Sequence, residues 1–87
     1  DAVLYQNRPN PFKDQTTIGF MLGRAGAARL RVYNAEGSLL FENEAYRPAG
    51  YHEIDVVLEN VQGGLLYYEL RTPDRVLSRK MIALATY

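Results

Sequence analysis

The feature that most constrains the fold is a series of short stretches in which apolar and polar residues alternate, separated by turn residues about every eight to twelve positions. In the clearest stretch, Ile18, Phe20 and Leu22 share one face of an extended strand. No stretch keeps apolar residues at helical spacing over the length of a helix. The pattern therefore predicts an all-β chain of short strands.

Turn residues divide the chain into about seven strands. We expect strands near 3–6, 16–22, 28–33, 38–45, 51–58, 65–70 and 75–85. Turns are expected at 34–37, 47–50 and 72–74, and the connection 59–64 has room for a short helical turn. Short, mostly antiparallel strands at this spacing favour a single Ig-like antiparallel β-sandwich over residues 1–87.

Composition excludes several function classes. A chain of 87 residues builds one core, and its ten basic and ten acidic residues leave no surplus for nucleic acid. It has no cysteine, so neither disulfides nor thiolate metal sites are available. No apolar run is long enough to span a bilayer, so we expect no stable membrane insertion. If the protein is exported, its signal peptide lies before Asp1.

The candidate catalytic and metal-binding residues favour a structural interpretation. His52, the single histidine, lies on the apolar face of its strand and lacks an oriented partner. Glu53 and Asp55 point to the opposite face and do not complete a metal site with it. Glu42 and Glu44 share one strand face, where a solvated surface that discourages edge association explains them. We expect no enzyme activity, no metal and no cofactor.

Two groups of surface residues leave alternatives open. The basic residues Arg71, Arg75, Arg79 and Lys80 gather in the last hairpin. They form either an ordinary charged surface or a docking surface for an acidic partner or a lipid-linked anionic sugar. A second group, the tyrosines, either packs along the strands or forms a carbohydrate platform. Its members are Tyr5, Tyr33, Tyr51 and Tyr67.

Five motifs in one register carry a family resemblance. They are L-Y-Q-N-R-P-N-P-F at 4–12 with T-T-I at 16–18, L-R-V-Y-N at 30–34 with Gly37, P-A-G-Y-H at 48–52, G-L-L-Y-Y-E-L at 64–70, and S-R-K-M-I-A-L at 78–84. Together they resemble the C-terminal sorting domains of the bacterial type IX secretion system. The opening motif also resembles the related Ig-like domain of flagellar hook-capping proteins.

The resemblance implies a function. A domain of this family directs an attached, upstream cargo protein through the periplasm and across the outer membrane, for surface anchoring or release. Its partners are an outer-membrane shuttle protein and a surface sortase. By this resemblance, the residues that the secretion machinery is expected to recognise are Arg79, Lys80, Met81, Ile82, Ala83 and Leu84. The structural motif residues are Pro9, Asn10, Pro11, Gly37, Gly50 and Gly64.

The position of residues 79–84 in the last predicted strand suggests how a receptor binds them. A terminal strand presents unpaired backbone groups along its edge, and strand pairing is a general mode of peptide capture. We therefore expect main-chain pairing with the last strand, with Arg79 and Lys80 setting the register. The alternative function is a structural or carbohydrate-binding Ig-like module of a surface protein. A sorting domain must be the last domain of its parent protein, whereas such a module need not be.

Overall fold

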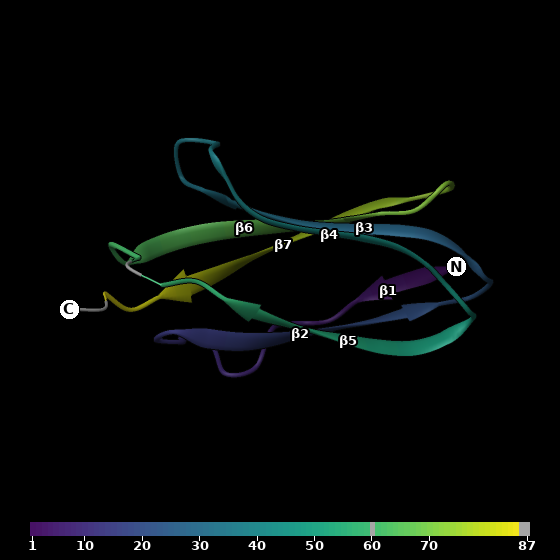
Figure 1. Ribbon diagram of the computed structural model, residues 1–87, viewed down its shortest axis with the longest axis horizontal. Coiled ribbons are helices and arrows are strands. Elements are labelled where there is room, and N and C mark those ends of the chain that lie inside the picture. The colour runs from purple at the N-terminus through teal and green to yellow at the C-terminus, as the bar shows by residue number, and fades with distance from the viewer. Residues whose placement is uncertain (60, 86–87) are drawn as a thin grey trace.

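The computed structural model describes residues 1–59 and 61–85, and these residues form seven β-strands and no helix (Figure 1). The strands are β1 (Ala2–Leu4), β2 (Gln15–Leu22), β3 (Gly26–Asn34), β4 (Leu39–Arg47), β5 (Gly50–Val57), β6 (Gly64–Arg71) and β7 (Val76–Ala83). The all-β architecture predicted from the alternation is confirmed.

The strands form two antiparallel sheets that lie face to face in Figure 1. The smaller sheet has the order β1-β2-β5, and the larger has the order β4-β3-β6-β7. The edge strands β1 and β7 approach each other across the sandwich. The molecule therefore has a β1–β7 side, where the first and last strands meet, and a β4–β5 side opposite it.

The inner faces of both sheets supply one apolar core. Ile18, Phe20 and Leu22 are buried on β2, as the alternation predicted. The other buried apolar residues are Leu4, Phe12, Ala28, Leu30, Val32, Ile54, Val56, Leu58, Leu66, Tyr68, Leu70, Met81 and Ala83. Burial of one large apolar side chain contributes about 1.5–3 kcal/mol, so packing holds this cysteine-free chain together.

The last strand is shorter than the predicted 75–85, for a reason at each end. Arg75 belongs to the preceding turn, because its amide donates to Thr72 Oγ1 (3.0 Å) and its carbonyl accepts from the Thr72 amide (2.9 Å). At the other end, β7 stops after Ala83, because Ala83 lies opposite Gly64, the first residue of β6. The end of β7 is thus set by the point at which β6 begins.

Two further expectations are corrected. β1 ends at Leu4 instead of Gln6, because the chain beyond it turns toward the inside of the sandwich, where the Tyr5 carbonyl accepts a bond from Tyr68. The helical turn considered for 59–64 is not formed by the described residues, where Glu59 lies in a turn and 61–63 have no regular structure. The turn at 47–50 carries the chain from the larger sheet to the smaller.

Candidate recognition site

The C-terminal half of β7 divides the predicted recognition residues into two sets. Met81 (0% exposed) and Ala83 (2%) point into the core. Lys80, Ile82 (40%) and Leu84 (48%) alternate with them and are exposed. While the domain is folded, a partner can therefore contact the side chains of the second set, and the first set holds the strand in place.

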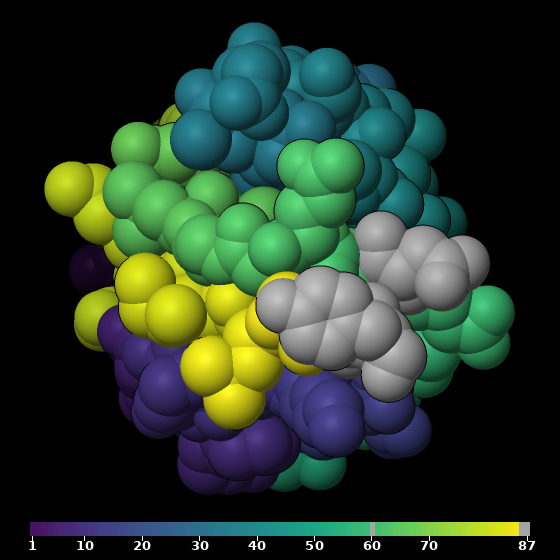
Figure 2. All heavy atoms as spheres, turned by 90° about the vertical axis from the view of Figure 1, so that its left-hand side faces the viewer, coloured from purple at the N-terminus to yellow at the C-terminus, as the bar shows by residue number. Residues whose placement is uncertain are grey.

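The outer edge of β7 is covered by residues 5–14, which we call the proline loop. Phe12 forms a parallel bridge with Ala83. The Phe12 amide donates to the Ile82 carbonyl (3.1 Å), and the Phe12 carbonyl accepts from the Leu84 amide (2.7 Å). Figure 2 shows the same arrangement from the end of the molecule, with the yellow end of β7 between green residues above and purple N-terminal residues below.

Two side chains of the proline loop extend this cover. Gln6 Nε2 donates to the Lys80 carbonyl (2.8 Å). Asn10 Oδ1 accepts from the Ile82 amide (2.9 Å). The expectation of an open edge is therefore wrong for residues 80–84, because the loop supplies the hydrogen bonds that a neighbouring strand would supply.

The proline loop is held from inside the core by Tyr68. The Tyr68 hydroxyl donates to the Tyr5 carbonyl (2.7 Å) and accepts from the Asn7 amide (3.0 Å). Burial raises the pKa of Tyr68, and the bond from the Asn7 amide opposes part of that shift. A buried hydroxyl on the larger sheet thus fixes the start of the loop.

Asn7 is itself buried, and its side chain links two other residues of the loop with β2 by hydrogen bonds. Its Nδ2 donates to the Pro9 carbonyl and to Thr16 Oγ1, both at 3.0 Å. Its Oδ1 accepts from Gln6 Nε2 (2.8 Å), the group that also reaches Lys80. The sequence analysis missed Asn7, Gln6 and the Tyr68 hydroxyl, although Gln6 and Asn7 stand inside the quoted opening motif.

Arg79 ties the two sheets together. Its Nε donates to the Leu4 carbonyl (2.7 Å), so the side chain crosses from β7 to β1. Lys80 is different, since its carbonyl bonds the loop while its side chain is exposed. Within the described residues, no carboxylate lies within ion-pair distance of Lys80.

The motif residues predicted to be structural lie at turns and at the covered edge. Asn10 bonds β7, and the Pro9 carbonyl also accepts from Thr16 Oγ1 (2.9 Å). The three motif glycines have positive φ: Gly37 +89°, Gly50 +123° and Gly64 +118°. At Gly37 this conformation closes the 34–37 turn, in which the Gly37 amide donates to the Asn34 carbonyl (3.0 Å).

The basic residues of the last hairpin do not form one patch. Arg71 lies 3.7 Å from a Glu69 carboxylate oxygen, and Arg75 lies 3.4 Å from one of Asp1. At about 3.3 Å per residue, the five positions from Arg75 to Lys80 span roughly 16 Å along β7. The basic surface therefore divides into a distal end and a proximal end near Leu84.

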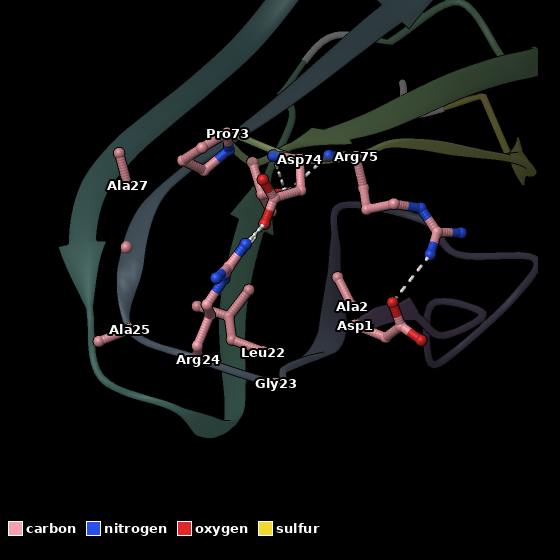
Figure 3. Close-up of a pocket in the computed structure, with 12 residues that line it drawn as sticks. Asp1, Ala2, Leu22, Gly23, Arg24, Ala25, Ala27, Pro73, Asp74 and Arg75 are labelled. Carbon is pink, nitrogen blue, oxygen red and sulfur yellow. Dashed lines mark hydrogen bonds and ion pairs between the residues drawn. The ribbon is translucent and has the colours of Figure 1, made fainter.

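A cavity of about 580 Å³ lies at the distal end, where the chain begins. Figure 3 shows Arg24 and Asp74 pointing toward each other, and Arg75 reaching Asp1. Arg24 lowers the pKa of the Asp74 carboxyl, first through the hydrogen bond and then through charge. Both arginines of this cavity are engaged in ion pairs.

The four surface tyrosines separate into two pairs. Tyr5 and Tyr51 lie on the smaller sheet with ring centroids 5.9 Å apart, and the Tyr51 ring covers Gly19. The Tyr51 hydroxyl donates to Glu53 Oε2 (2.9 Å). Tyr33 and Tyr67 lie opposite each other on the larger sheet. One platform made by all four is thus wrong, because the two pairs belong to different sheets.

The histidine and the carboxylates have local partners. His52 Nε2 is 2.8 Å from the Pro48 carbonyl, and its ring packs on Phe20. Arg31 pairs with Glu42, and Arg8 pairs with Glu53. Among residues 1–59 and 61–85, no group of three His, Asp or Glu side chains is placed to hold a metal ion. The same part of the chain contains no helix with the length and apolar character to cross a bilayer.

These features define a class: a small two-sheet sandwich whose last strand is closed along its edge by the N-terminal segment. Residues 8–84 match the family described as "Secretion system C-terminal sorting domain". The chain belongs to this family and is a sorting domain of the type IX secretion system. No curated protein sequence matches it.

Two solved structures share the fold. Dimeric latent PorU from Porphyromonas gingivalis superposes with a TM-score of 0.65 at 18% identity, over 98% of this chain and 9% of that one. An engineered protein superposes with a TM-score of 0.58 at 14% identity, over 100% of this chain and 20% of that one. The chain thus spans a small part of each protein that it resembles.

Proposed function

We propose that the secretion machinery recognises this domain at residues 79–84, through the exposed side chains of Lys80, Ile82 and Leu84. The specific partners are an outer-membrane shuttle protein and a surface sortase, and the cargo is attached on the N-terminal side. The cargo passes through the periplasm and is anchored at the surface or released. The domain contributes no catalysis to this process.

The observation that carries the proposal is the way β7 is held. Buried Met81 and Ala83 fix the strand from the core side, and the proline loop fixes its edge. The outward side chains are therefore presented in one register before any partner arrives. Such preorganisation lowers the entropy that binding must otherwise overcome.

The local bonding of the polar residues supports a role without catalysis. His52 is bonded to a turn carbonyl, and Glu53 is shared between Arg8 and Tyr51. A general base must be positioned within hydrogen-bond reach of the group that it deprotonates. These side chains instead fasten turns and strands.

A reporter fusion tests the recognition site. Residues 1–87 are joined to the C-terminus of a fluorescent protein that carries an export signal, in a bacterium with a type IX system. We expect the wild-type fusion at the cell surface or in the medium, and K80E to reduce that fraction at least about tenfold, which corresponds to roughly 1.4 kcal/mol. R24E, which makes the same change of charge at an exposed residue of the distal end, is the control.

Point substitution is preferred to truncation here. Removing residues 80–87 also removes Met81 and Ala83 from the core, so a trapped reporter would then report unfolding instead of lost recognition. Normal delivery of a folded K80E fusion would show that the site is elsewhere. Failure of the wild-type fusion would refute autonomous sorting by this chain.

A second candidate function is supported by the pair Tyr5 and Tyr51 on the smaller sheet. Exposed aromatic rings in this arrangement suit stacking against sugar rings. An accessory carbohydrate-binding module would show glycan affinity that Y51A abolishes, together with no surface delivery. Delivery that Y51A leaves unchanged favours the sorting function.

A further inference from the structure

We propose that the secretion machinery docks on the outer face of the β6–β7 hairpin through side-chain contacts, and that Leu65 and Tyr67 of β6 belong to this surface with Lys80 and Ile82. This proposal rests on the proposed function. It adds Leu65 and Tyr67, which lie outside residues 79–84. It also proposes that the partner contacts side chains on the outer face of the hairpin, which we call face docking, and does not pair with the edge of β7 as an added strand.

The strand register brings the four residues together. Leu65 lies directly opposite Ile82, and Tyr67 lies directly opposite Lys80. Directly opposite residues in an antiparallel pair have Cβ atoms about 4.5–5.5 Å apart on the same face. Leu65 and Tyr67 are partly exposed on that face, while Leu66 and Tyr68 between and beside them are buried.

The chemistry of this surface points to a partner whose contact surface is largely apolar and includes one carboxylate. Ile82 is 40% exposed, and Leu65 and Tyr67 extend the apolar area next to it. Residues 75–85 contain three basic residues, Arg75, Arg79 and Lys80, and no acidic one. Since Lys80 has no ion-pair partner within the described residues, a partner carboxylate can pair with it without displacing another group.

The covered edge argues against capture by strand pairing at the same place. A strand added beside residues 80–84 would have to replace four hydrogen bonds, from Gln6, Asn10 and both backbone groups of Phe12. It would also displace Phe12, which is 1% exposed, from the core. Docking on the outer face breaks none of these contacts.

The first experiment tests the face with matched double variants in the reporter fusion. We expect Y67S/I82S to lower the delivered fraction at least about tenfold, because buried aromatic and apolar contacts dominate interface energies. The control is Y46S/V57S, which removes a tyrosine that is 76% exposed on β4 and a β-branched residue that is 51% exposed on β5. It should change delivery less than about twofold.

The second experiment tests whether the edge must open. The bridge between Phe12 and Ala83 sets Lys13 beside Leu84, so K13C/L84C allows a disulfide between the loop and the end of β7 in this cysteine-free chain. Loss of free thiols verifies the bond. Face docking predicts that the locked double variant is delivered as well as L84C alone, whereas strand pairing predicts that the lock abolishes delivery.

The outcomes separate this inference from the proposed function. If the wild-type fusion is not delivered, the proposed function fails. If it is delivered, but Y67S/I82S matches its control or the lock blocks delivery, only face docking is overturned. A concentration-dependent dimer of the purified domain that Y67S/I82S dissociates would also overturn it, since a second copy would then occupy the face.

Discussion

The two long sides of the sandwich are built differently. On the β1–β7 side, the proline loop hydrogen-bonds the edge of β7, Arg79 bonds β1, and the Tyr68 hydroxyl holds the loop from within. On the β4–β5 side, within the described residues, no hydrogen bond joins the two edge strands. Arg47 and His52 there pack against the Phe20 ring, and the buried Arg47 Nε has no hydrogen-bond partner among residues 1–59 and 61–85.

The difference shows two solutions to the same problem. An uncovered edge strand invites pairing with other chains, and charged side chains are one defence against it. β4 carries Glu42 and Glu44 on its exposed face, and β5 carries Glu53 and Asp55. The C-terminal half of β7 is instead covered by the proline loop. A covered edge leaves the outward side chains of β7 accessible while it hides the backbone, which suits the proposed recognition of these side chains without edge-to-edge aggregation.

The largest expected effect is a loss of stability on truncating the inward face of β7, compared with its outward face. M81A should lower the free energy of unfolding by about 2–5 kcal/mol, because Met81 is fully buried beneath the covered edge. I82A, one residue further on the outward face, should cost less than about 1 kcal/mol. Denaturant unfolding of both variants measures the difference, and equal losses would mean that β7 does not alternate as described.

A smaller effect tests what holds the β1–β7 side. Y68F should cost about 1–3 kcal/mol, because it leaves the Tyr5 carbonyl and the Asn7 amide without a partner inside the protein. Y67F, on the exposed face of the same strand, is the matched control and should be near neutral. An unchanged unfolding midpoint for Y68F would show that the loop is held by packing alone.

The pH dependence of the free energy of unfolding is a second measurement of what the Tyr68 hydroxyl contributes. Burial raises the pKa of Tyr68 above its ordinary value of about 10, so the fold favours the protonated phenol. Its contribution to stability is present below that value and is lost as the pH rises through the folded-state pKa. The wild type should therefore lose stability relative to Y68F on raising the pH past about 10.

The smallest expected effect is a change in amide hydrogen exchange, which compares the covered edge of β7 with the edges of β4 and β5. N10A removes the acceptor for the Ile82 amide, and we expect that amide to exchange about fivefold faster, in line with a net hydrogen-bond contribution of roughly 1 kcal/mol. The edge amides of β4 and β5, which have no strand on their outer side, should be unaffected and should exchange fast in both proteins. Slow exchange along those edges would remove the contrast between the two sides.

Local pattern was sufficient to predict the existence and order of the seven strands, but not the ends of β1 and β7. The buried alternation of Ile18, Phe20 and Leu22, and that of Leu66, Tyr68 and Leu70, follows directly from a period of two. The turn at Gly37 was also visible, because its position demands a backbone conformation that glycine adopts freely. The motifs in one register, from Leu4 to Leu84, placed the chain in its family.

The state of the β7 edge could not be predicted in this way. Phe12 reaches Ala83 across almost the whole chain, and Asn10 reaches Ile82 across 72 positions. A polar residue such as Asn7 carries no periodic signal that it will be buried against Tyr68. The sequence alone therefore determined which faces are apolar and where the chain turns, because those depend on neighbouring residues. Only the tertiary structure decided which edge is covered and which side chains remain exposed, because pairing between distant segments depends on how the whole core packs.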